Sequence, residues 1–458
     1  MKVIHMLNIL TRRKSLRQTR PTGFALAALL IATAVSGLSQ STALADGPVR
    51  VQVVKTDEGW QLLRGGKPWF VKGVGGDASK QLLVQYGGNT FRTWGAEHLA
   101  TELDEAQKLG LTVIAGMWLG HKPQGFDYHN ADQVKQQLDK CREIVRRYRN
   151  EPALLIWAIG NEMEDDEPPA DPAVWQAIED IAAMIKKEDP NHPTMTVIAE
   201  MVDGKTPLFR QHCPDVDILG INAYASASTA GERYRKAGGA KPFIITEFGP
   251  PGQWEKKKTP WRAVPELTST EKTAWYRKSY VQGVLGENNL CLGSCAFLWG
   301  FKSEASPTWY GMFLSDGTKV AAVDTMSELW TGKPVPNPCP TIKGLKLADG
   351  DGRVGPGAVV HALLDASSAN GDPIKVTWEL QRDVRHGADD GAGNVPAFPD
   401  AIINATDKSA EVKMPADTGG YRLYAYVRTP HSGSAVANVC LFVTGPVAKP
   451  TAANVAVP

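Results

Sequence analysis

Between residues 70 and 330 the chain alternates short apolar runs with longer amphipathic segments. Each run is almost continuously hydrophobic, which is typical of parallel strands covered on both faces. In the segments 131–150 and 171–187 the apolar residues instead fall on one helical stripe. The eight apolar runs are Phe70–Gly76, Thr90–Gly95, Thr112–Gly120, Ala153–Glu162, Thr194–Met201, Asp217–Tyr224, Phe243–Gly249 and Gly293–Phe301.

Eight strand–helix units over about 260 residues have the size and rhythm of an α/β fold, the (β/α)8 TIM barrel. The alternative is a doubly wound open sheet, which binds phosphate with a glycine-rich loop after its first strand. Here the first run ends only in Gly73-Val74-Gly75-Gly76. We therefore expect a barrel over residues 70–333.

The segments on either side of the barrel follow another pattern. Residues 46–69 predict a β-hairpin that caps the bottom of the barrel, and the proline-rich segment 334–340 predicts a stiff linker. Beyond it, period-two strands predict a small C-terminal antiparallel β-sandwich, immunoglobulin-like, over 341–446, with a flexible tail at 447–458. The predicted strands are Ile342–Leu347, Ala358–Leu364, Ile374–Leu380, Ala410–Met414, Tyr421–Arg428 and Val436–Val443. A spacer and a carbohydrate-binding module both remain open as its role.

Residues 1–45 have the features of an export signal peptide. A basic stretch precedes the apolar run Phe24–Val35, and Ala43-Leu44-Ala45 forms a cleavage site before Asp46. Residues 11–17 also resemble a twin-arginine motif, so that route and the general secretory route stay open. We expect a secreted or periplasmic protein. No integral membrane span is expected, since no later run reaches about 18 apolar residues.

Composition and charge narrow the possible partners. The chain has 458 residues, 43% hydrophobic and 22% charged, which fits a globular protein. Residues 1–45 hold six basic and no acidic residues, which leaves 44 basic against 49 acidic residues in the remainder. A slightly acidic protein has no reason to bind nucleic acid. No histidine cluster indicates a metal, no cofactor is expected, and the six cysteines fit structural thiols or disulfides.

Two of the predicted strands end in a carboxylate, namely Glu162 on the fourth and Glu247 on the seventh. The carboxyl ends of barrel strands are where such enzymes place their chemistry. A buried acid is costly without a partner or a purpose. Two carboxylates that face one cavity are what glycosidic cleavage needs, one protonated and one ionised.

Asn161-Glu162 and Glu247 resemble the signature of the large clan of retaining (β/α)8 glycosidases, which includes endoglucanases, mannanases, β-galactosidases and β-glucuronidases. The resemblance implies that Glu162 is the general acid/base and Glu247 the nucleophile. It further implies that Asn161 hydrogen-bonds the sugar 2-hydroxyl, and that Arg92 and Tyr224 contact the nucleophile. Trp299, in Phe297-Leu298-Trp299-Gly300, would form the floor under the cleaved sugar.

Other residues are candidates because sugars present both apolar faces and hydroxyl groups. Trp94 and His121 are expected to bind substrate, His121 either through sugar hydroxyls or as a loop cap. Further aromatic candidates at loop positions are Trp118, Trp254, Trp261, Trp309 and Tyr310. The acidic segment Glu164–Glu167 is expected to be a solvated loop, with a cation or basic-sugar site as the alternative.

These observations predict an exported retaining β-glycoside hydrolase. The expected substrate is a β-glucan-type polysaccharide or oligosaccharide cleaved by double displacement, with transglycosylation open. The alternatives are an exo-acting β-glycosidase of the galactosidase, glucuronidase or mannosidase type, and a non-catalytic carbohydrate-binding protein. The sequence gives no indication of oligomeric state.

Overall fold

A computed structural model describes residues 47–166, 171–201, 204–287, 289–383, 395–431 and 433–445. The expected signal peptide and C-terminal tail lie outside these ranges. Within them no helix is both long enough and apolar enough to cross a membrane. All six cysteines are unpaired thiols, and five of them are buried.

The predicted barrel is confirmed: eight parallel strands close on themselves in the order β10-β11-β4-β5-β6-β7-β8-β9. Their side chains are almost entirely buried, which is why the sequence shows continuous apolar runs rather than alternation. The strands are β4 (Val71–Gly75), β5 (Thr90–Arg92), β6 (Thr112–Met117), β7 (Leu154–Ile159), β8 (Thr194–Ala199), β9 (Ile218–Asn222), β10 (Phe243–Phe248) and β11 (Cys291–Phe297).

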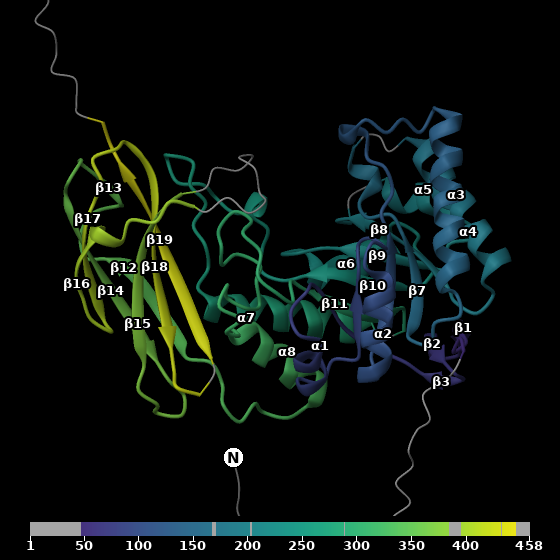
Figure 1. Cartoon of the computed structure of the whole chain (residues 1–458), viewed down its shortest axis with the longest axis horizontal. Helices are drawn as coiled ribbons and strands as arrows, with labels where there is room; N and C mark the ends of the chain where they lie inside the picture. Colours follow the sequence, from purple (N-terminus) through teal and green to yellow (C-terminus); the bar gives the residue numbers. More distant parts are fainter. Residues whose placement is uncertain are drawn as a thin grey trace, which may run out of the picture. The chain divides into compact units, whose positions relative to one another are not determined.

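Helices α1 to α7 each connect one barrel strand to the next, and α8 follows the last strand, β11 (Figure 1). Their starts follow local sequence: Asn130 caps α3 through its side chain, and Asp171 followed by Pro172 begins α4. The helices are α1 (Lys80–Gln85), α2 (Leu99–Leu109), α3 (Ala131–Tyr148), α4 (Pro172–Glu188), α5 (Lys205–His212), α6 (Ala230–Lys236), α7 (Ser269–Lys278) and α8 (Ala321–Thr331). Shorter helical segments are η1 (Lys122–Gln124), η2 (Met163–Asp166), η3 (Ala227–Thr229), η4 (Gln253–Glu255), η5 (Ser279–Val284), η6 (Leu285–Glu287) and η7 (Pro399–Ala401).

A three-stranded antiparallel sheet covers the amino-terminal end of the barrel. It consists of β1 (Val51–Thr56), β2 (Gly59–Arg64) and β3 (Lys67–Pro68). The Val51 amide donates to the carbonyl of Asn191, just before β8, at 2.7 Å, and Val51 and Leu62 pack on residues of the barrel interior. This end is closed, so the opposite end carries the open loops.

The C-terminal β-sandwich is confirmed as two four-stranded sheets, ordered β12-β14-β17-β16 and β13-β19-β18-β15. All pairs are antiparallel except β13 with β19. The strands are β12 (Thr341–Leu347), β13 (Arg353–Val354), β14 (Val359–Ser367), β15 (Lys375–Arg382), β16 (Ile402–Ala405), β17 (Ser409–Lys413), β18 (Gly419–Arg428) and β19 (Ser434–Val443). The short strands β13 and β16 were not predicted, because two to four residues carry too little alternation to recognise.

Candidate active site

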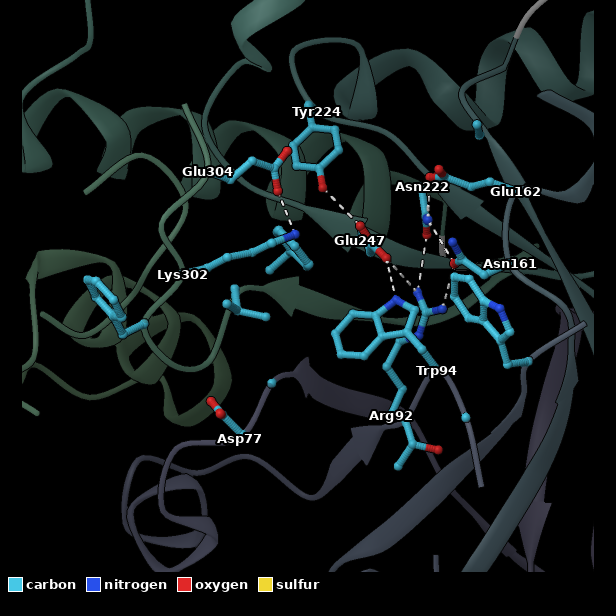
Figure 2. Close-up of a pocket in the computed structure, with 18 of the residues that line it drawn as sticks. Asp77, Arg92, Trp94, Asn161, Glu162, Asn222, Tyr224, Glu247, Lys302 and Glu304 are labelled. Atoms are coloured by element: carbon cyan, nitrogen blue, oxygen red, sulfur yellow. Dashed lines mark hydrogen bonds and ion pairs between the residues drawn. The ribbon is translucent and has the colours of Figure 1, made fainter. Parts of the chain in front are cut away.

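A cavity of about 1010 Å³ opens at the carboxyl ends of the barrel strands. Figure 2 shows Glu162 and Glu247 facing it together with Arg92, Trp94 and Tyr224. Six of the eight residues predicted for the site therefore line one cavity: Arg92, Trp94, Asn161, Glu162, Tyr224 and Glu247. The other two, His121 and Trp299, are not among its lining residues.

Glu247 is a buried carboxylate held by three hydrogen-bond donors. It lies near the end of β10 and is only 6% exposed. Its Oε1 accepts from Trp94 Nε1 at 2.9 Å and from Arg92 Nη1 at 3.2 Å, and its Oε2 accepts from Tyr224 Oη at 2.9 Å. Three donors, one of them cationic, compensate the carboxylate charge and fix its orientation.

Arg92 links the strands that surround the cavity. Its guanidinium is buried and, besides binding Glu247, donates to Asn161 Oδ1 at 2.9 Å and to the carbonyl of Thr246 at 3.0 Å. These bonds join the ends of β5, β7 and β10. Because the guanidinium group is planar and donates in fixed directions, it holds its hydrogen-bond partners in a fixed geometry.

Glu162 approaches the cavity from the turn after β7. Its backbone is in the left-handed region at φ 56°, and its amide donates to the carbonyl of Val197 at 2.8 Å. The carboxylate accepts from Asn222 Nδ2 at 2.7 Å. A positive φ at a residue other than glycine is unfavourable and is found preferentially at functional sites.

Asn222 belongs to the site but was not predicted as a site residue. Buried at the end of β9, it donates to Glu162 and Asn161, and its Oδ1 accepts from Arg92 at 3.2 Å and Thr246 at 2.8 Å. It thereby connects the hydrogen-bond networks of the two carboxylates. The available signal was an amide residue ending the apolar strand Ile218–Asn222.

Phe297, not Trp299, contributes the aromatic ring of β11 to the cavity. The Phe297 ring meets those of Trp94 and Tyr224 edge to face, each at 6.0 Å. Trp299 is fully buried, donates from Nε1 to the carbonyl of Ser79 at 3.1 Å and packs on Phe313. The strand ends at Phe297, and after the next residue the chain turns away, so the structure does not bring Trp299 under the sugar site.

The remaining aromatic candidates divide into exposed and buried groups. Trp118 and Trp254 line the cavity with 44% and 58% of their surface exposed. His121 instead lies against Trp118, with ring centroids 4.9 Å apart. The rest do not line this cavity: Trp309 and Tyr310 are buried, and Trp261 is partly exposed beside Phe442.

The expectation of a solvated acidic loop is wrong for Glu164. This residue of η2 is buried, and its Oε1 accepts from the Ala199 amide at 2.7 Å and from Lys205 Nζ at 2.9 Å. Burial raises the pKa of Glu164, while Lys205 and the hydrogen bonds oppose that shift. Glu164 therefore anchors the segment that carries Glu162 to β8 and α5.

The cavity carries more acidic than basic groups. Besides the two central glutamates it is lined by Asp77, Glu97, Glu102, Glu200 and Glu304. Its cations are Arg92 and Lys302, and Lys302 Nζ lies 2.5 Å from Glu304 Oε2 and 5.4 Å from the Phe297 ring centre. No group of three or more potential metal ligands occurs among the described residues.

Comparison with known proteins gives matches to glycosidases. Residues 81–263 match the family model "Glycosyl hydrolases family 2, TIM barrel domain". Among solved structures, a Bifidobacterium dentium β-glucuronidase complexed with coumarin-3-O-glucuronide has a TM-score of 0.49 at 16% identity, covering 62% of this chain and 49% of that chain. A Bacteroides uniformis β-glucuronidase has a TM-score of 0.47 at 13% identity, covering 86% and 48%.

Curated relatives match part of the chain by sequence. The β-glucuronidase of Rattus norvegicus is 26% identical over 200 residues, 39% of this chain and 28% of the relative. That of Chlorocebus aethiops is 26% identical over 300 residues, 57% and 43% respectively. The chain thus spans less than half the length of these relatives. The family match, these relatives and the barrel itself agree with the resemblance seen in the sequence: the barrel is similar to those of the large clan of retaining (β/α)8 glycoside hydrolases that includes endoglucanases and the β-galactosidase/β-glucuronidase family.

Proposed function

We propose that this protein hydrolyses β-glycosidic bonds with retention of configuration. The observation that carries the proposal is Glu247, which accepts three hydrogen bonds on the wall of the cavity that Glu162 also faces. A carboxylate held in this way is oriented for attack, and its charge is compensated before substrate binds.

In the first step Glu247 attacks the anomeric carbon as Glu162 protonates the departing glycosidic oxygen, giving a covalent glycosyl-enzyme. In the second step Glu162 removes a proton from water, which displaces Glu247 and releases the sugar. Asn161 donates to the sugar 2-hydroxyl, since its own Oδ1 accepts from Arg92 and Asn222. The same steps with an acceptor sugar in place of water give transglycosylation.

Azide rescue tests these assignments. Glu247→Gly should lower kcat by about 10³-fold or more, and azide should restore turnover of an activated aryl glycoside as the α-glycosyl azide. Glu162→Ala should instead give the β-glycosyl azide, because azide then attacks the glycosyl-enzyme. Hydrolysis by Glu247→Gly at the wild-type rate without azide would contradict the proposal.

The first candidate for the mode of action is an exo-acting β-glycosidase, because the matched relatives are named β-glucuronidases. A terminal uronic acid fits this cavity poorly, since Lys302 is already paired with Glu304 and carboxylates outnumber cations. We therefore favour a neutral sugar. Comparing 4-nitrophenyl β-glucoside, β-galactoside, β-mannoside and β-glucuronide would test this, and a clear preference for the glucuronide would contradict it.

An endo-acting β-glucanase is the second candidate. One observation favours it: the cavity wall at Phe301 also belongs to a second cavity of about 760 Å³ beside the sandwich. A closed pocket would hold one terminal sugar, whereas a continuing groove accommodates a chain. Product analysis on β-1,3- and β-1,4-glucans distinguishes the modes, since endo cleavage gives oligosaccharide ladders and exo cleavage a single small sugar.

We also propose export, on the basic stretch and apolar run of residues 1–45. Mass spectrometry of the protein recovered from a bacterial periplasm should give a chain that begins at Asp46. A protein recovered only from the cytoplasm, with its first 45 residues intact, would contradict this proposal.

A further inference from the structure

The second cavity lies between the loop after β11 and the sandwich. Ser303 and Leu314 line it from the barrel, and strands β15 and β18 line it from the sandwich. Phe301 lines both this cavity and the catalytic one, and its side chain is 39% exposed. The two cavities therefore meet at an exposed aromatic ring.

The sandwich wall combines hydrogen-bonding groups with an aromatic ring. Thr377, Glu379 and Gln381 alternate along β15 and so share one face. Tyr426, opposite Thr377 on β18, adds its ring, which stacks on Tyr424 at 5.8 Å. Sugars are bound by this combination, because their rings have apolar faces edged by hydroxyl groups.

Gln381 carries a polar atom that lacks a partner. Its Oε1 is buried without a hydrogen-bond donor among the described residues, while its Nε2 donates to Glu379 at 2.8 Å. A buried acceptor left unsatisfied costs free energy that a ligand hydroxyl would recover. Arg428 already pairs with Asp316 at 2.7 Å, and Glu379 adds a carboxylate to the wall, so a neutral ligand fits better than an acidic one.

The position of the groove indicates which part of a substrate it would hold. In Figure 2, Lys302 and Glu304 lie on one side of Glu247 and Glu162 lies on the other. The leaving group departs on the side of Glu162, because that residue protonates the glycosidic oxygen. Phe301 directly precedes Lys302, so the groove extends the side that holds the non-reducing end of the cleaved chain.

We propose that the sandwich and the loop after β11 form a binding site for additional sugar units of a neutral β-linked gluco-oligosaccharide, on the non-reducing side of the cleaved bond. The sandwich is then part of the substrate-binding surface rather than a spacer. This inference rests on the retaining chemistry proposed above, and it favours the endo-acting candidate.

Chain-length dependence tests the site. Cello- and laminari-oligosaccharides of two to six units are compared by kcat/KM in the wild type, in Thr377→Trp, which fills the groove, and in Gln381→Ala, which removes the side-chain amide and its unpaired oxygen. Val359→Trp is the matched control, since Val359 is an exposed strand residue of the other sheet, 46% exposed. Thermal unfolding of each variant verifies folding.

The wild type should cleave the hexamer at least 10-fold more efficiently than the dimer of the preferred linkage. That ratio should fall several-fold in both groove variants and stay unchanged in Val359→Trp. A wild-type ratio near one, or an unchanged ratio in folded groove variants, would overturn the inference. If no glycoside is cleaved, the proposed hydrolysis fails, and binding of the hexamers is measured by calorimetry instead. Hexamer binding that the groove variants weaken would still support the sugar-binding site. Hexamer binding that is absent, or that the groove variants leave unchanged, would overturn the site.

Discussion

The two central carboxylates belong to one hydrogen-bond network. Glu247 is held by three donors, and the bond from Asn222 links Glu162 to the network around Arg92. A nucleophile must keep one geometry, while an acid/base must exchange a proton with the leaving group and then with water. Three fixed donors suit Glu247 as the proposed nucleophile, and the bond from Asn222 keeps Glu162, the proposed acid/base, in the same network.

Tyr224→Phe should lower kcat/KM by about 10- to 100-fold, since it removes a hydrogen bond to a charged group. Burial, followed by the charge of Glu247, raises the pKa of Tyr224 well above 10. The phenol therefore remains a donor at neutral and mildly alkaline pH, and the loss should be equal at pH 6 and pH 9 in steady-state kinetics. A loss that disappears at pH 9 would contradict this role. Tyr234→Phe is the control, because Tyr234 is buried away from the cavity.

Asn222→Ala should impair leaving-group protonation more than attack by Glu247. We expect kcat/KM to fall by about 100-fold for an alkyl or sugar leaving group and by about 10-fold or less for dinitrophenolate, which departs without a proton. Measuring kcat/KM over a series of aryl glycosides with different leaving groups shows how the loss depends on the leaving group. An equal loss for every leaving group would indicate a merely structural role, and Asn404→Ala on the sandwich surface is the control.

At the level of single residues, charged groups were easier to predict than aromatic ones. A glutamate that ends an apolar strand is conspicuous, so Glu162 and Glu247 could be recognised from sequence. Phe297 and Trp299 are both aromatic, and only the point at which β11 ends decides which ring reaches the cavity. Asn222 has no charge that would mark it in the sequence, and its importance depends on side-chain contacts with the ends of three other strands, β5, β7 and β10.

At the level of elements, the eight barrel strands were predictable because burial on both faces leaves long apolar runs. The ends of the strands were harder to predict: the fourth apolar run extends to Glu162, whereas strand β7 ends at Ile159. In the turn after Ile159 the backbone of Glu162 adopts a left-handed conformation with positive φ. The hydrophobic pattern of the sequence does not indicate that conformation. The role of Glu164 was hidden for a related reason, because its partner Lys205 lies in a distant helix.

Glu164→Ala should destabilise the fold by about 3–5 kcal/mol, because it leaves the Lys205 ammonium buried without its counter-charge. Urea unfolding measures this loss. The double variant Glu164→Leu with Lys205→Met should regain much of the stability, since it removes both buried charges. Equal stability of Glu164→Ala and the wild type would show that the anchor does not hold the turn after β7.

At the level of the whole molecule, a buried polar network joins the barrel to the sandwich. Glu266, before α7, accepts from Asn438 of β19 at 2.7 Å, and Arg422 of β18 donates to the carbonyl of Val264 at 3.1 Å. Lys272 of α7 also pairs with Glu266 at 2.5 Å. The proline-rich segment 334–340 predicted a linker, yet these contacts come from residues far apart along the chain and could not be anticipated from it.

This network makes the stability of the whole molecule depend on pH. Burial acts to raise the pKa of Glu266, but Lys272 and Arg422 outweigh it and hold that pKa below its ordinary value. A carboxyl group with a lowered folded-state pKa stabilises the fold above its unfolded pKa, near 4.5, and loses that contribution as the pH falls through the folded value.

Glu266→Gln should therefore lower the free energy of unfolding at pH 7 by about 3–5 kcal/mol, because Lys272 and Arg422 lose their buried counter-charge. Its stability should also decline less steeply than that of the wild type between pH 5 and pH 3. Calorimetry at each pH measures both the free energy of unfolding and its dependence on pH. At pH 7 the variant should unfold in two transitions, as the sandwich separates from the barrel. Glu232→Gln, which breaks only an exposed ion pair with Lys236, is the control and should change neither. A single transition with wild-type pH dependence in Glu266→Gln would mean that apolar packing alone couples the two domains.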